Sequence, residues 1–98
     1  MKVNNKSFNE WLEKDYISYD DNMEEYRTLN GYFSMGVANT TSTTYNELIG
    51  LMLIWLLDKG CGLCKSFNSF IVWDKLQNTI EQDDLYTALK QAIESIKE

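Results

Sequence analysis

The sequence predicts a mainly α protein: one compact bundle of four to five helices over residues 1–98, around a buried central helix at about 45–59. Three observations favour this class. A chain of 98 residues fits one hydrophobic core and leaves no room for a second. Its apolar residues, 44% of the composition, recur mainly at intervals of three and four, the period of an α-helix. One segment is apolar nearly all round, which is typical of a helix enclosed by others.

The first helix is expected at about 8–18. Ser7 and Glu10 match a capping box, in which the serine oxygen accepts from the amide of Glu10 and the glutamate reaches back to the helix start. The apolar side chains that follow share one stripe of a 3.6-residue period: Phe8, Trp11, Leu12 and Tyr16. This stripe is expected to face the core.

A second, short helix is expected to begin near Asp20 or Asp21, because acidic residues favour a helix N-terminus. It would end at Asn30-Gly31, a pair that suits a left-handed C-terminal cap. The side chains that it would bury are Met23, Tyr26 and Leu29.

Residues 31–43 depart from the helical pattern. Phe33, Met35 and Val37 alternate with small residues, a period of two that is typical of a short strand near 32–37. A single strand needs a partner for its backbone groups, which residues 67–72 or a strand of another protein could supply. An irregular apolar loop over the central helix is the alternative, and the sequence leaves strand and loop open.

The central helix at about 45–59 is the most apolar element. Thr44 and Glu47 match a second capping box, and Gly60 ends the segment. The ten apolar-rich residues 48–57 span only about 15 Å as a helix, half of a bilayer core, so a buried helix is the better interpretation. Because it is apolar on nearly every side, its neighbours are expected to cover it on more than one side.

Two more helices are expected toward the C-terminus. One would run over about 65–81, although residues 67–73 also have strong β-propensity. The last, at about 84–97, has the clearest pattern, because Asp83 and Asp84 precede a regular apolar stripe. That stripe consists of Leu85, Ala88, Leu89, Ala92, Ile93 and Ile96.

The composition argues against several functions. The chain has no histidine, the commonest general base and metal ligand, and its five glycines form no phosphate-binding loop. We therefore expect no enzyme, no cofactor and no metal. Nine scattered lysines and arginines in a chain of net charge −6 argue against direct binding to nucleic acid. The polar residues 1–6 carry no signal peptide, so the expected location is the cytoplasm, with no membrane partner.

Cys61 and Cys64 form a C-x-x-C pattern at an expected helix start, where the helix dipole lowers a thiol pKa. The absence of proline removes the cis-proline that faces such a motif in thioredoxin-like folds. Two thiols with no histidine supply half of a zinc shell within one chain. The favoured interpretation is two reduced structural thiols, and a thiol or metal protein centred on residues 61–64 is the second alternative function.

The acidic residues are concentrated near the N-terminus. Residues 8–26 contain seven acids and one lysine, and the rest of the chain has eight acids and eight bases, so the whole net charge lies on this segment. Such a field attracts a basic partner, and the interleaved aromatic residues could anchor one. The residues predicted to bind the partner are Asp15, Tyr16, Tyr19, Asp20, Asp21, Glu24 and Glu25. The alternative is the solvated outer face of two ordinary helices.

The sequence therefore predicts a small acidic protein-binding module. Its favoured form is an inhibitor or immunity-type protein that neutralises a basic partner, such as a nuclease toxin, through an acidic, tyrosine-bearing face. The first alternative is a structural or assembly subunit, in which the apolar face of the helix at 84–97 completes a homo-oligomer.

Overall fold

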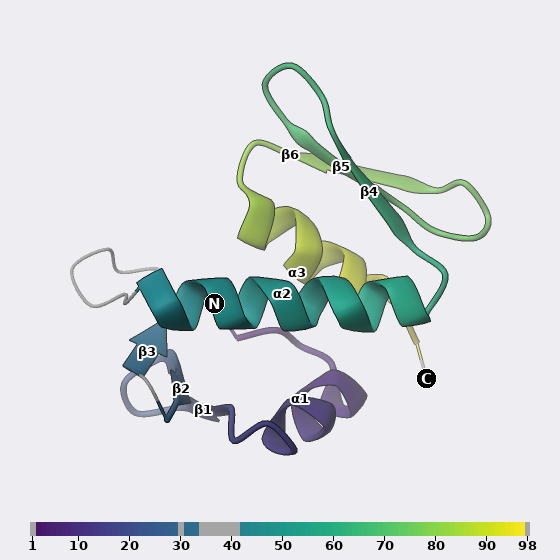
Figure 1. Cartoon of the computed structure of the whole chain (residues 1–98). Helices are drawn as coiled ribbons and strands as arrows, with labels where there is room; N and C mark the ends of the chain where they lie inside the picture. The colour runs from purple at the N-terminus through teal and green to yellow at the C-terminus, as the bar shows by residue number, and fades with distance from the viewer. Residues whose placement is uncertain (1, 30, 34–41, 98) are drawn as a thin grey trace.

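The computed structural model describes residues 2–29, 31–33 and 42–97, and within these the protein is a mixed α/β fold. It has three helices and two separate three-stranded antiparallel sheets, so the prediction of a bundle of four to five helices is wrong. In chain order the elements are α1 (Lys6–Glu13), β1 (Ser18–Asp20), β2 (Glu25–Thr28), β3 (Gly31–Phe33), α2 (Ser42–Asp58), β4 (Gly62–Lys65), β5 (Phe70–Trp73), β6 (Thr79–Gln82) and α3 (Leu85–Ser95). Helix α2 crosses the middle of the molecule, with α1 and the first sheet on one side and α3 and the second sheet on the other (Figure 1).

The second predicted helix is a β-hairpin. Strands β1 and β2 pair antiparallel, with Tyr19 opposite Tyr26 and Asp20 opposite Glu25. The Oδ1 atom of Asp20 accepts hydrogen bonds from the backbone N–H groups of Asn22 (2.9 Å) and Met23 (3.2 Å). Side chain-to-backbone bonds of this kind compete with helix formation. Asp20, which the sequence analysis interpreted as the start of a helix, therefore stabilises the turn of a hairpin.

The predicted helix at 65–81 is also absent, and its residues form the meander β4–β5–β6. Leu63, Val72 and Ile80 lie side by side across the three strands. The β-propensity of residues 67–73 decided the structure over the helical spacing. Asp74 holds the turn between β5 and β6, because its Oδ1 accepts from the backbone N–H groups of Leu76 (2.8 Å) and Asn78 (3.0 Å).

Helix α1 is shorter than predicted and has a different N-cap. The Oδ1 atom of Asn5, rather than the hydroxyl of Ser7, accepts the capping hydrogen bond, which Phe8 N–H donates at 2.9 Å. At the other end, Tyr16 N–H donates to Glu13 O and Ile17 N–H donates to Leu12 O. These are the two bonds of a Schellman motif, and Tyr16 has the left-handed φ of +61° that the motif requires. The chain therefore leaves the helix well before residue 18.

Helices α2 and α3 confirm the predicted helices at about 45–59 and 84–97. The predicted helix at 84–97 is α3, with Asp84 as its N-cap at 2.8 Å from Thr87 N. Its apolar stripe packs inward, against α2 and the second sheet. That stripe is not available to complete a homo-oligomer. Helix α2 begins at Ser42, so Thr44 is a fully buried residue inside it, rather than its cap.

The prediction that neighbours cover α2 on more than one side is confirmed, but the helix is not buried all round. Its core face carries Leu48, Met52 and Trp55, all buried. On the opposite face, Ile54 is 55% exposed and Leu57 is 61% exposed. Two layers thus enclose α2 from its flanks and leave one apolar face in solvent.

The predicted strand near 32–37 is present only in part within the described residues. Strand β3 pairs with β2, placing Phe33 opposite Tyr26, so its partner is neither residues 67–72 nor another protein. Residues 34–41, which include the rest of the predicted strand, lie outside the described residues. None of the described helices is long and apolar enough to span a bilayer.

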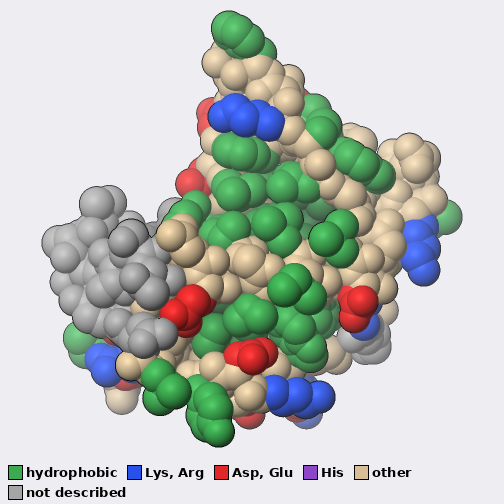
Figure 2. Space-filling view, in the orientation of Figure 1, with side chains coloured by type: hydrophobic (Ala, Val, Ile, Leu, Met, Phe, Trp, Pro, Cys, Tyr) green, Lys and Arg blue, Asp and Glu red, His purple; other side chains and the backbone are tan. Residues whose placement is uncertain are grey.

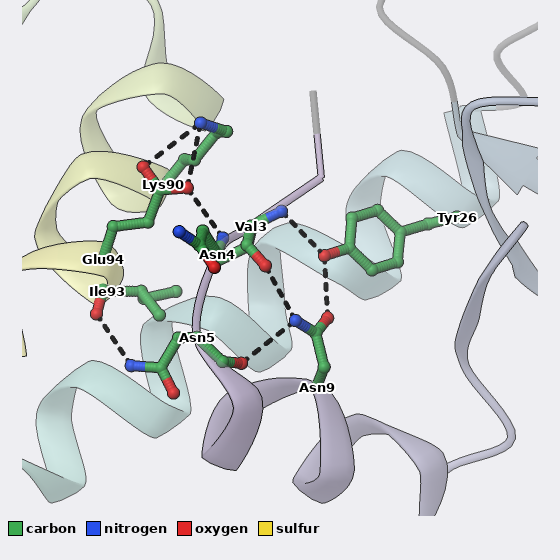
Figure 3. A network of polar contacts seen from close by, with 8 residues as sticks. All are labelled: Val3, Asn4, Asn5, Asn9, Tyr26, Lys90, Ile93 and Glu94. Atoms are coloured by element: carbon green, nitrogen blue, oxygen red, sulfur yellow. Dashed lines mark hydrogen bonds and ion pairs between the residues drawn. The ribbon is translucent and has the colours of Figure 1, made fainter. Parts of the chain in front are cut away.

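A polar network fastens the N-terminal segment to three elements (Figure 3). The Tyr26 hydroxyl accepts from Val3 N–H at 3.0 Å and donates to Asn9 Oδ1 at 2.9 Å, while Asn9 Nδ2 donates to Val3 O at 2.7 Å. Asn5 Nδ2 donates to Ile93 O at 3.0 Å. Residues far apart in the sequence thereby hold β2, α1 and α3 together.

Candidate protein-binding surface

The seven predicted partner-binding residues lie on one connection and one hairpin, instead of on two helices. Asp15 and Tyr16 form the connection between α1 and β1, and Tyr19 and Asp20 belong to β1. Asp21 and Glu24 lie in the turn of the hairpin, and Glu25 begins β2. The seven residues therefore lie on and around the short strand β1, which is one of the two edge strands of its sheet.

Arg27 forms ion pairs with two of these acids and offsets one of their two negative charges. Its Nε atom lies 3.3 Å from Asp20 Oδ2 and 3.4 Å from Glu25 Oε2. The acidic segment counted in the sequence ends at residue 26, one position before this arginine, and so overstates the charge of the hairpin. Register explains the contact: Asp20 pairs with Glu25, and Arg27 follows two residues later on the same face of the sheet.

Glu25 is a structural residue in this arrangement. It is only 2% exposed, and its Oε2 atom accepts no hydrogen bond although it lies within ion-pair distance of Arg27. A buried carboxylate without its counter-charge is strongly disfavoured. Glu25 and Asp20 thus share Arg27 and set the geometry of the hairpin.

The turn of the hairpin carries the acids that Arg27 does not reach. Asp21 and Glu24 are exposed, and no lysine or arginine among the described residues forms an ion pair with either. Between them, Met23 is 55% exposed. The sequence predicted Met23 as a core residue of a helix, and it is instead an apolar side chain at an acidic tip.

The acids of this turn act electrostatically on Tyr19. The half-buried Tyr19 ring packs edge-on against the Tyr26 ring, with 4.9 Å between the two ring centroids. Lys2 Nζ lies 5.5 Å from the centroid of the Tyr19 ring. Burial raises the pKa of its hydroxyl, and the nearby charges of Glu24 and Asp21 raise it further. Tyr19 therefore remains a neutral hydrogen-bonding group at physiological pH.

Tyr16 is the most exposed aromatic residue of the set, with 72% of its surface accessible. It occupies a left-handed backbone conformation, which an L-residue other than glycine, asparagine or aspartate adopts at a cost of about 1 kcal/mol. Neither the hydrophobic core nor the helix cap requires an aromatic side chain at this position. Strained and exposed residues of this kind concentrate at functional sites.

Asp15 lines a shallow groove of about 410 Å³ between the α1–β1 connection and the outer face of α2. The other lining residues are Ile17, Asn46, Glu47, Gly50, Leu51 and Ile54. Sequence reasoning missed this groove because it interpreted the segment at about 45–59 as a buried central helix. The signal that could have found it is Gly50, which interrupts an otherwise large-residue run.

Comparison with protein-family models, with curated proteins and with solved structures finds no match. The function is therefore inferred from the surface itself.

The two cysteines are both free thiols, one buried and one exposed. Cys61 lies just after the C-terminal end of α2, instead of at a helix start, and Cys64 is exposed in β4. Burial raises the pKa of the Cys61 thiol; the charge of Asp74 raises it further, and that of Lys75 lowers it. Among the described residues, no three cysteine or carboxylate side chains converge to hold a metal ion.

Proposed function

We propose that this chain is a protein-binding module that engages a basic protein through the acidic edge formed by Asp15, Tyr16, Asp21, Met23 and Glu24. The observation that carries the proposal is that this edge combines two exposed acids lacking a described cation with two exposed large apolar residues. Acids accelerate encounter with a basic partner, and tyrosine and methionine supply contact area at the interface centre.

The remaining predicted residues have a supporting role in this proposal. Asp20 and Glu25 are paired with Arg27, and Tyr19 packs on Tyr26, so these side chains hold the hairpin in shape. An interface built on a preorganised hairpin loses less conformational entropy on binding than a flexible acidic segment does.

The class of partner that fits this edge best is an enzyme with a basic site for nucleic acid, and an immunity-type inhibitor of a nuclease toxin is the corresponding role. A nuclease presents clustered lysines and arginines to the phosphate backbone. A protein that places carboxylates on those groups competes directly with the substrate.

The test is inhibition of nucleic-acid cleavage by a panel of purified nuclease-toxin domains at equimolar inhibitor. Inhibition of at least one domain is expected, and it should weaken as salt rises from about 0.05 to 0.5 M because screening shortens the range of the charges. The double variant Asp21→Lys with Glu24→Lys should slow association by at least about fivefold, since it reverses the attracting field.

A matched control keeps the net charge of that variant but moves the change elsewhere. Glu81→Lys with Asp83→Lys alters two exposed acids in and beside β6, on the other side of α2. This control should retain inhibition. Equal loss in both double variants would show a net-charge effect and contradict the assignment of the hairpin, as would a panel in which no domain is inhibited.

A further inference from the structure

The solvent-facing side of α2 carries a continuous apolar stripe, which we define as Gly50, Leu51, Ile54 and Leu57. Positions 50, 54 and 57 are spaced i, i+4 and i+7 and therefore share one side of the helix. Hydrophobic side chains gather in a broad band across the face of α2 turned to the viewer in Figure 2, with single acidic side chains at its edges. Contiguous apolar faces left in water often serve as binding sites.

The stripe is hollowed at its N-terminal end. Apart from its chain neighbours and the backbone of its own helix, a Cβ atom built on Gly50 would meet no atom within 4 Å, so the space beside Gly50 is open. The groove of about 410 Å³ lies here, with Gly50, Leu51 and Ile54 on the α2 side and Asp15 on the opposite side. A gap flanked by larger side chains on a helix is the shape into which a side chain of a second helix inserts.

One edge of the stripe is acidic. Glu47, Leu51, Ile54 and Asp58 follow the spacing i, i+4, i+7 and i+11, so a carboxylate stands at each end of the row. Asp15 adds a third carboxylate from the α1–β1 connection. No lysine or arginine is among the described residues that line the groove.

We propose that the stripe and its groove dock an amphipathic helix of the basic partner, with apolar residues over Gly50 and Ile54 and with lysines or arginines along the edge that faces Asp15, Glu47 and Asp58. This inference rests on the proposed function and names the segment of the partner that is recognised. Docking of an amphipathic helix into an apolar groove is a common recognition mode, and the acidic edge fixes the direction in which the charged flank lies.

A second copy of this chain fits the stripe less well. In an antiparallel pair of α2 helices, the Glu47 end of one helix would lie beside the Asp58 end of the other. Each copy also carries a net charge of −6, so association would bring like charges together. The charge pattern therefore selects a cationic occupant.

The probes are two synthetic peptides of about 18 residues, a length at which a designed helix begins to be stable alone. Both carry leucines at i, i+3, i+4 and i+7; one has lysines on the flanking positions and the other has glutamates. Titrations follow the fluorescence anisotropy of the labelled peptide. The lysine-flanked peptide should bind, and the glutamate-flanked peptide should bind at least about tenfold more weakly.

Two variants remove the docking surface without touching the core. Ile54→Asp places a charge in the stripe, and Gly50→Phe fills the groove; each should weaken binding of the lysine-flanked peptide at least about tenfold. Leu76→Asp is the matched control, because Leu76 is an exposed leucine in the turn between β5 and β6. It should bind the peptide as the unaltered protein does. Circular dichroism and thermal melting confirm that each variant is folded.

Several outcomes would overturn the docking proposal. Peptide binding that is unchanged by both Ile54→Asp and Gly50→Phe would place the peptide elsewhere. Sedimentation showing a dimer that Ile54→Asp dissociates would make a second copy the occupant. Nuclease inhibition that survives Ile54→Asp, with peptide binding also unchanged, removes the docking helix and leaves the proposed function. Peptide binding that depends on Ile54, with no nuclease inhibited, supports the docking surface and removes the nuclease assignment.

Discussion

The hydroxyl of Tyr26 donates a 2.9 Å hydrogen bond to Oδ1 of Asn9, joining the central strand of the first sheet to helix α1. The same hydroxyl accepts from Val3 N–H, and the Tyr26 side chain is fully buried. One side chain thus connects three segments and satisfies a buried backbone donor. The acidic hairpin, whose strand β2 contains Tyr26, is thereby held against the body of the protein.

Replacing Tyr26 with phenylalanine should destabilise the protein by about 1–3 kcal/mol, because Val3 N–H and Asn9 Oδ1 lose their partner inside the protein. Chemical denaturation monitored by tryptophan fluorescence measures the change. Tyr16→Phe removes an exposed hydroxyl and should alter stability by less than about 0.5 kcal/mol. Equal stability of Tyr26→Phe and the unaltered chain would mean that water replaces the hydroxyl in the network.

Replacing Arg27 with glutamine should destabilise the hairpin by about 1–2 kcal/mol, because the buried carboxylate of Glu25 loses its counter-charge. The figure is set below that of a fully buried pair because the Arg27 side chain is half exposed. Adding Glu25→Gln to Arg27→Gln should restore part of the loss, since the buried group is then neutral. A double-mutant cycle measures the coupling, and additive effects would contradict the pairing.

Replacing Tyr16 with glycine should stabilise the protein by about 1 kcal/mol, because glycine adopts the left-handed conformation without steric strain. The same change should weaken nuclease inhibition, because it removes the exposed ring from the acidic edge. The melting temperature and the inhibition of nucleic-acid cleavage are both measured on the same preparation of the variant. A variant that gains stability and keeps full inhibition would exclude Tyr16 from the interface.

The turn held by Asp74 should loosen in acid. Hydrogen bonds from the backbone and side chain of Asn78, and from Leu76 N–H, hold the pKa of the Asp74 carboxyl below its ordinary value of 3.8. A carboxyl with a depressed folded pKa contributes stability above its unfolded pKa and loses it as pH falls toward the folded pKa. The protection of the Leu76 and Asn78 amides, relative to their intrinsic exchange rates at each pH, should therefore fall below about pH 4. Asp74→Asn should remove this pH dependence.

Two glycines at and near α2 should respond to alanine in opposite ways. Gly50 lies inside the helix with open space around it, so Gly50→Ala should stabilise the protein by about 0.5–1 kcal/mol. Gly60 has a φ of +84°, and a Cβ there would clash with the Lys75 side chain. Gly60→Ala should destabilise by about 1 kcal/mol or more through strain at the helix end. Melting temperatures of the two variants provide the comparison.

The sequence by itself determined the two longest helices. The apolar stripe of α3 persists over about three turns, which is long enough to indicate a helix, and the segment of α2 is a long apolar run between a capping box and Gly60. It also determined which segment carries the acidic charge, since composition does not depend on the fold. The acidic residues 8–26 contribute that charge whether they form a helix or a hairpin.

Only the tertiary structure decided what the short segments became. Strands of three or four residues leave too few positions to separate a period of two from a period of 3.6, so Met23 and Tyr26 fitted a helix stripe equally well. Pairing with β1 and β3, and burial of Tyr26 against Asn9 and Val3, selected the strand.

The face of α2 that is exposed to solvent likewise depends on the tertiary structure. The apolar run of α2 does not indicate which of its side chains become buried, because burial depends on where the other helices and the sheets pack around it. The two sheets and their helices flank α2 and leave Ile54 and Leu57 uncovered. Local spacing predicts that a segment is a helix, whereas the side that stays in water follows from contacts between residues far apart in the chain.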